Sequence, residues 1–148
     1  MRSIGPIIFT AAIVFASTAS AAPPQIVPPG WKPVGKPETT ARVFVSPDGF
    51  ASIRFGHEAA HANPRGNDAD RFVHKPNEQV TYEQRGVSWF VVSGYRGREI
   101  FYRKGNLACG GSRWNLIEFR YPREEKLKMD ATVAMVAHNM AAYGRDCG

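Results

Sequence analysis

The chain has 148 residues, of which 43% are hydrophobic and 22% are charged. This apolar content is typical of globular proteins, and the length is enough for one domain with one core but not comfortably for two. The 19 Lys and Arg residues against 13 Asp and Glu residues give a formal net charge of +6. That sign favours anionic polymers, anionic lipids or acidic proteins as partners, and the charge alone does not choose among them.

Residues 1–22 have the pattern of a cleavable secretory signal peptide. Arg2 lies beside the free amino group, an apolar run follows at residues 7–16, and Ala19-Ser20-Ala21 gives the small-x-small cleavage pattern. The apolar run is too short for a membrane anchor, which needs roughly 20 apolar residues. No cysteine near the cleavage point offers a lipid attachment site. We therefore expect a periplasmic or secreted protein with no transmembrane anchor after cleavage.

Export changes how the charge and the cysteines are interpreted. Loss of Arg2 leaves a net charge of 18 − 13 = +5, and outside the cytoplasm an anionic envelope partner is favoured over nucleic acid. Cys109 and Cys147 are the two cysteines of the chain. Because exported thiols are normally paired, we predict a disulfide between them, which would stabilise the fold by about 4 kcal/mol. The alternative is a reactive thiol, but no nearby base in the sequence would activate it.

Residues 23–41 form a proline-rich stretch ahead of a single domain at 42–148. Six prolines fall within residues 23–37. Because proline interrupts helices and strand ladders, we expect an extended, polyproline-like leader that acts as a tether. Such a stretch can also dock into aromatic grooves, but a spacer is the simpler interpretation.

From residue 42 onward, short alternating apolar segments predict β-strands. Residues 43–45 and 51–55 flank Pro47-Asp48-Gly49, a turn sequence that predicts a hairpin. Residues 57–78 are polar and broken by proline and glycine, so we expect at most one or two short helices there. We expect four further strands: one that begins at Val80, and three that span residues 89–95, 100–103 and 114–121.

The C-terminal region predicts a helix. Met129, Val133, Val136 and Met140 recur at i, i+4, i+7 and i+11 and so share one stripe, while Leu127 falls off it. The stripe should pack on the sheet, and Gly144 and residues near it should end the helix. The fold class is therefore α+β: an antiparallel sheet of about five to six strands with a C-terminal helix on one face. The aromatic residues of the strands should divide between this core and the opposite face of the sheet. They are Trp89, Phe90, Phe101, Trp114 and Phe119.

Several runs resemble a family of exported bacterial domains that occur alone or behind membrane-tethered serine/threonine kinase-like chains. The similarity covers about residues 40–142 and is carried by Phe44-Val-Ser-Pro-Asp-Gly, Val80-Thr-Tyr, Trp89-Phe-Val-Val-Ser-Gly-Tyr, Ile100-Phe-Tyr-Arg-Lys, Cys109-Gly-Gly-Ser-Arg-Trp and Tyr121-Pro with Lys126 and Asp130. The family in turn resembles the PsbP-like fold of extrinsic photosystem proteins. The resemblance implies a PsbP-like sheet flanked by helices, an exported location and a non-enzymatic accessory role, and it transfers no catalytic residue.

One motif has a chemical meaning, His57-Glu58-Ala59-Ala60-His61. On a helix, His57 and His61 would lie one turn apart and could ligate zinc, with Glu58 placed to activate a bound water. Pro64 follows closely, however, and Asn67 stands where the extended motif has its third histidine. We therefore prefer a solvated loop that matches the motif by chance over a catalytic zinc site. Weak metal binding by His57 and His61, with His74, is a third interpretation that ranks between these two.

A second candidate is a basic hairpin. Arg96, Arg98, Arg103 and Lys104 cluster in the sequence around Tyr95 and Tyr102 and would form an anion-binding surface if they shared a face. The simpler reading is a solvated hairpin whose long side chains protect a sheet edge.

Two functions follow from these patterns. The preferred one is an exported, non-enzymatic binding or accessory module that contacts an envelope partner, with no cofactor. The alternative is a zinc-dependent hydrolase built on His57, Glu58 and His61.

Overall fold

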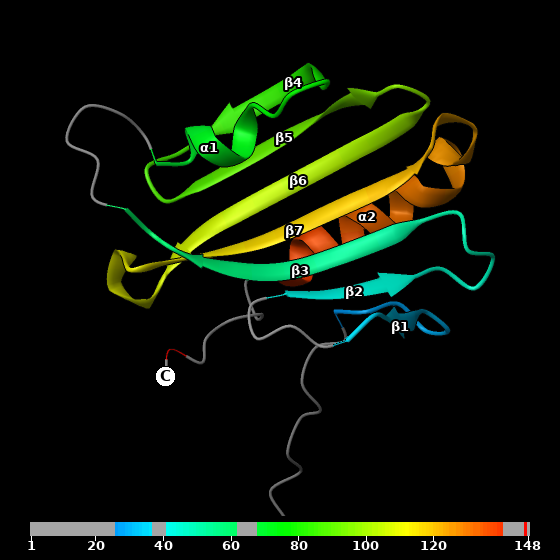
Figure 1. Cartoon of the computed structure of the whole chain (residues 1–148), viewed down its shortest axis with the longest axis horizontal. Coiled ribbons are helices and arrows are strands. Elements are labelled where there is room, and N and C mark those ends of the chain that lie inside the picture. Colours follow the sequence, from blue (N-terminus) through cyan, green and yellow to red (C-terminus); the bar gives the residue numbers. More distant parts are fainter. Residues whose placement is uncertain (1–25, 37–40, 62–67, 141–146, 148) are drawn as a thin grey trace, which may run out of the picture.

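The computed structural model describes residues 26–36, 41–61, 68–140 and 147, which fold into one antiparallel sheet with a helix on each side (Figure 1). The strand order is β1-β2-β3-β7-β6-β5-β4. The strands are β1 (Lys32–Val34), β2 (Ala41–Val45), β3 (Ser52–Ala59), β4 (Gln79–Arg85), β5 (Trp89–Arg96), β6 (Glu99–Ala108) and β7 (Arg113–Pro122). The helices are α1 (Asp70–Val73) and α2 (Lys126–Asn139), with 3-10 turns at Cys109–Gly111 and Arg123–Glu125.

The α+β class with a C-terminal helix is confirmed, but the expected number of strands is wrong, because the described residues contain seven. The additional strand is β1, which lies inside the predicted leader and pairs with β2 in the register Lys32↔Val45 and Val34↔Val43. A strand can contain Pro33 here because an edge strand needs hydrogen bonds on one side only. Part of the stretch predicted as a free tether is therefore the edge of the sheet.

The α2 side of the sheet carries the first core. Met129, Val133, Val136 and Met140 are all buried against β3 and β7, as the sequence stripe predicts. Leu127 is 90% exposed, which also agrees with its place off the stripe. The strands contribute the alternate residues that face α2, among them Ile53, Phe55, Ile117 and Phe119. The predicted helix end at Gly144 lies outside the described residues.

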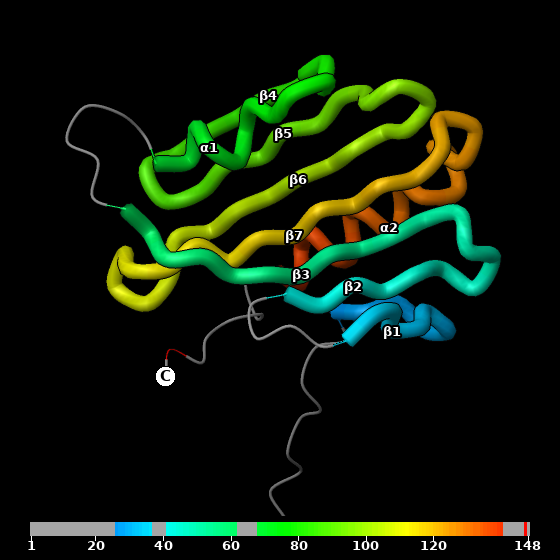
Figure 2. The backbone as a smooth tube through the Cα atoms, viewed as in Figure 1, coloured from blue at the N-terminus to red at the C-terminus, as the bar shows by residue number. Residues whose placement is uncertain are grey.

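The opposite side of the sheet, where α1 lies in Figure 2, carries a second core that is rich in aromatic residues. Phe72 of α1 stacks on Phe90 with 5.9 Å between ring centroids. Trp114 meets both rings, at 6.0 and 5.6 Å. The strand aromatics thus divide between the two faces as predicted, except that Trp89 is 38% exposed.

The chain carries the predicted disulfide. Cys109 and Cys147 are bonded, with 5.5 Å between their Cα atoms. Residues 1–22, where the signal peptide is predicted, lie outside the described part of the chain. In that described part, no helix has the length and apolar character needed to cross a membrane.

Candidate functional site

The helix that a zinc site would require at residues 57–61 is not formed, and the solvated loop expected in its place is wrong for residues 57–59, because these residues belong to β3. His57 and Glu58 are consecutive residues of β3, paired with Asn115 and Trp114 of β7, so their side chains point to opposite faces of the sheet. Residues four apart in an extended chain are separated by roughly 13 Å, against about 6 Å in a helix. The described residues contain no group of three or more His, Cys, Asp or Glu that could hold a metal ion.

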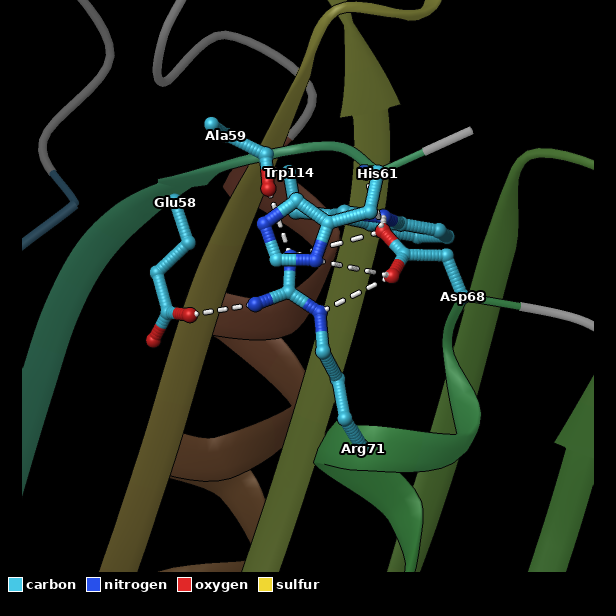
Figure 3. A network of polar contacts seen from close by, with 6 residues as sticks. All are labelled: Glu58, Ala59, His61, Asp68, Arg71 and Trp114. Carbon is cyan, nitrogen blue, oxygen red and sulfur yellow. Dashed lines mark hydrogen bonds and ion pairs between the residues drawn. The ribbon is translucent and has the colours of Figure 1, made fainter. Parts of the chain in front are cut away.

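Glu58 and His61 of the motif belong instead to a network centred on Arg71 (Figure 3). Its guanidinium donates to the Glu58 carboxylate at 2.8 Å, to the Ala59 carbonyl at 2.6 Å and to the Asp68 carboxylate at 3.0 Å. Asp68 also accepts from the Trp114 indole at 2.9 Å and from the His61 backbone N–H at 3.0 Å. The network ties the segment that leads into α1 to the end of β3, and Glu58 serves in it as an ion-pair partner.

The same contacts set the charge state of Asp68. Burial alone would raise its pKa, but the hydrogen bonds from the His61 backbone, Arg71 and Trp114 lower it below its ordinary value. The carboxylate is thereby held ionised as an acceptor, which suits a structural role and not proton transfer at neutral pH.

The predicted basic surface is not assembled either. Arg103 and Lys104 are neighbours on β6 and therefore point to opposite faces. Arg103 is 2% exposed on the α1 side. Lys104 lies on the α2 side, where it donates to the Ala137 carbonyl of α2 at 3.0 Å and burial lowers its pKa. Only Arg96 and Arg98 remain exposed at the β5–β6 turn.

Arg103 is instead the centre of a buried ionic cluster on the α1 side. It donates to the Glu118 carboxylate at 2.7 Å, to the Phe72 carbonyl at 2.6 Å and to the Glu78 carboxylate at 2.8 Å. The Arg103 and Glu78 side chains are 3% and 1% exposed. These bonds connect β6 with β7, with α1 and with the start of β4. Sequence reasoning missed the cluster because its members are 15 to 31 residues apart.

Glu118 of β7 also forms ion pairs with two other cationic side chains. Lys75 donates to it at 3.1 Å and Arg120 at 2.8 Å, in addition to Arg103. Burial alone would raise the pKa of Glu118, but the charge of Arg103 and its hydrogen bond, together with the charges of Lys75 and Arg120, lower that pKa to about 2. Both carboxylate oxygens therefore accept bonds from cations within the fold.

A cleft of about 260 Å³ opens beside this cluster, between β3, β7 and the α1 segment. We call it the ionic cleft. Arg54 and Glu58 line its β3 side, and Arg71 and Lys75 line the α1 side. The rest of the lining comes from further residues of β3, α1, β6 and β7: Gly56, His57, Phe72, Arg103, Leu116 and Glu118.

A second depression, of about 500 Å³, lies on the other face of the sheet, and we call it the tyrosine groove. Tyr95, Tyr102 and Tyr121 contribute to it from the strands. Lys126 and Asp130 of α2, whose charged groups lie 2.9 Å apart, contribute from the helix. Burial raises the pKa of both Tyr102 and Tyr121, with the charges of Tyr82 and Asp130 as second causes, so their hydroxyls stay protonated as hydrogen-bond donors.

The surface beside the tyrosine groove is rich in large exposed side chains. Tyr82 of β4 is 47% exposed and Trp89 of β5 is 38% exposed. Tyr82 is paired with Ser93, which lies in register with Tyr102, so Tyr82 and Tyr102 share the α2 side of the sheet. The part of this face formed by β4 and β5 is therefore an exposed surface with aromatic side chains next to the tyrosine groove, and we call it the open face.

Comparison with known proteins identifies a fold but no family. No family model matches the chain, and no curated protein matches it. The chain is similar to the Ran-binding protein Mog1p of Saccharomyces cerevisiae, with 13% identity and a TM-score of 0.50 over 78% of this chain and 82% of that one. A mutant of the protein Mog1 is similar at 14% identity with a TM-score of 0.49, over 77% and 81% of the two chains. At such low identity the likeness to Mog1p shows a shared fold alone.

Proposed function

We propose that the chain is an exported, non-enzymatic binding module whose open face receives an extended segment of an envelope protein. The observation that carries this proposal is the open face itself, where Tyr82 of β4 and Trp89 of β5 are both more than a third exposed. Tyr and Trp are enriched at protein interfaces and among the residues that dominate binding energy. A contiguous exposed surface of this kind is typical of interaction sites.

The two edges of the sheet differ in a way that supports an extended partner. β1 has three residues and contains Pro33, so it is a poor template for another strand. β4 has seven residues without proline and ends the strand order on the other side. Its outer backbone groups adjoin the open face, so a partner strand could pair with β4 while its side chains contact Tyr82 and Trp89.

The polar residues of the ionic cleft support binding rather than catalysis. Glu58, Asp68 and Glu118 each accept hydrogen bonds from arginine or lysine side chains. A carboxylate engaged in this way is a poor general base, because its pKa is far below neutral or its lone pairs are occupied. The zinc-hydrolase alternative has no geometric support in the described residues.

The exported location and the PsbP-like form of the fold belong to the same proposal. The N-terminal pattern of residues 1–22 supports export. The Cys109–Cys147 disulfide supports an oxidising compartment, where such bonds persist. The antiparallel sheet with α2 on one face agrees with what the family resemblance implies. N-terminal sequencing of the secreted or periplasmic protein should give a chain that starts at Ala22 or Pro23.

Site-specific photocrosslinking in cells tests the binding function. A photoreactive phenylalanine analogue is placed at Tyr82 or Trp89, with Leu127 as the matched control, because Leu127 is 90% exposed and belongs to α2 and not to the strands that form the open face. We expect one envelope protein to be captured from the first two positions and not from the third. The purified partner should then bind the wild-type chain and lose at least about tenfold in affinity for Tyr82→Ala/Trp89→Ala. Equal binding by that double variant and by Leu127→Ala would refute the proposed surface.

A further inference from the structure

Arg54 is the unmatched cation of the ionic cleft. The side chains that line the cleft, together with their ion-pair partners, include five Arg or Lys residues and four carboxylates. The cations are Arg54, Arg71, Lys75, Arg103 and Arg120, and the carboxylates are Glu58, Asp68, Glu78 and Glu118. Every carboxylate is in an ion pair with one or more of the other four cations. Among the described residues, no ion pair or hydrogen bond includes the Arg54 guanidinium. The cleft therefore has one positive charge more than it neutralises.

The strand register explains why Arg54 has no partner. Arg54 of β3 lies directly across from Glu118 of β7, and cross-strand neighbours at this spacing ordinarily form a pair. The Glu118 oxygens, however, already accept bonds from Arg103, Lys75 and Arg120. With those acceptors taken, Arg54 is an exposed residue in the lining of the cleft whose guanidinium donors are available to solvent or to a ligand.

We infer that the ionic cleft is a binding site for a small organic carboxylate, with Arg54 and Lys75 as the residues that hold its charge. A guanidinium binds a carboxylate through two parallel hydrogen bonds. Lys75 is 35% exposed and, among the described residues, its ammonium donates one side-chain hydrogen bond, to Glu118, so it has further donors to offer. A single unmatched positive charge suits a monocarboxylate, whereas inorganic phosphate would bring up to two negative charges.

The remaining lining favours a ligand with a short apolar body. Leu116 and Phe72 line the cleft between the charged rims. Gly56 contributes no side chain to the β3 side, which leaves room beside Leu116, its partner in the ladder. A volume of about 260 Å³ is slightly below the usual range for drug-sized ligands, which begins at about 300 Å³. It suits a free aliphatic acid of a few carbons or the C-terminal residue of a peptide.

The ionic cleft is independent of the binding surface proposed above. It lies on the α1 side of the sheet, whereas the open face lies on the α2 side. Either site can therefore exist without the other, and a failure to bind carboxylate would leave the partner-binding proposal unaffected.

Titration of the ¹⁵N-labelled, oxidised full chain by nuclear magnetic resonance tests this inference. The probes are sodium propionate, a short peptide with a free C-terminal carboxylate, the same peptide amidated, and inorganic phosphate at equal ionic strength. Saturable shifts are expected at the backbone amides of Gly56 and Leu116 with the carboxylate probes. Stronger binding of the free peptide than of propionate would identify a peptide C-terminus as the source of the carboxylate, and the reverse a free acid.

Arg54→Gln supplies the decisive variant and Arg42→Gln its control. Both arginines are exposed residues of the same half of the sheet, and Arg42 is outside the cleft. We expect Arg54→Gln to raise the dissociation constant of the carboxylate probe at least tenfold and Arg42→Gln to change it less than twofold. Lys75→Gln, also at an accessible side chain, should weaken binding as well and provides a second variant. The inference is overturned if no carboxylate gives saturable shifts, if the amidated peptide or phosphate binds equally well, or if both arginine variants lose affinity to the same extent.

Discussion

Replacing Arg103 by methionine should lower the free energy of unfolding by about 3–5 kcal/mol, because it removes one partner of a buried ion pair and leaves the other uncompensated. The guanidinium makes three hydrogen bonds of 2.6 to 2.8 Å. Glu118 would keep Lys75 and Arg120 as partners. Glu78 would not, since its side chain is 1% exposed and its second oxygen, Oε2, already has no hydrogen-bond partner. Most of the loss should therefore come from Glu78.

Urea denaturation followed by tryptophan fluorescence measures this loss, with Trp114 as a buried reporter in the same aromatic core. Arg96→Met is the matched control, because Arg96 is exposed at the β5–β6 turn, and it should change stability by less than about 0.5 kcal/mol. The double variant Arg103→Met/Glu78→Met should be more stable than Arg103→Met alone, since the orphaned buried carboxylate is gone. The reasoning is refuted if Arg103→Met behaves like Arg96→Met, or if the second substitution restores nothing.

Three further outcomes can be tested on the same protein. The pKa of Glu118 falls from an ordinary 4.5 to about 2 on folding. Its ionisation therefore contributes about 3 kcal/mol to the free energy of unfolding, a contribution that is complete above pH 4.5 and is lost as the pH falls towards 2. Glu118→Gln should flatten this part of the stability–pH curve, which urea titration measures. The variant Cys109→Ser/Cys147→Ser should lose about 4 kcal/mol of stability, and the natively exported protein should take up no alkylating reagent before reduction; labelled thiols would contradict the bond. Gly94→Ala would place a Cβ against the carbonyl oxygen of Gln79, so it should cost about 1–3 kcal/mol and accelerate hydrogen exchange in β4, while unchanged exchange would show that β4 adapts.

Periodicity in the sequence was sufficient for most of the fold. The alternation of residues 51–55 and 114–121 predicts two strands that do pair, as β3 and β7. The four-residue spacing of Met129 and Val133 likewise predicts the helix stripe that is buried in the structure. These features were predictable because each depends on the local chain alone. β1 was missed since its stability comes from a partner, β2, and not from its own proline-rich residues.

The candidate sites were harder to predict because they depend on which residues meet across the sheet. The zinc-binding interpretation of His57 and His61 requires a helix. In the structure, His57 belongs to β3, and pairing with β7 gives this segment an extended conformation. The basic run at Arg103 and Lys104 presupposes a common face, but strand alternation separates the two residues. One feature of the sequence did indicate that Arg103 is buried. It lies two residues after Phe101 in a strand, so the two side chains share a face, and an aromatic residue indicates that this face is buried. Its partners Glu78 and Glu118 could only be identified from the fold.

The widths of the layers explain why both faces of the sheet keep unfilled surface. Neighbouring strands are about 4.8 Å apart, so seven strands span roughly 29 Å, whereas one helix with its side chains is about 10 Å wide. α2 therefore packs over β3, β6 and β7 and leaves the open face over β4 and β5. α1 has four residues and covers still less of the other side, where the buried charges of Arg103, Glu78 and Glu118 occupy space that a longer helix would fill with apolar side chains. The ionic cleft and the open face thus share one cause, the mismatch between a broad sheet and two narrow covers, and this makes both of them sites at which a ligand or partner can complete a layer of the fold.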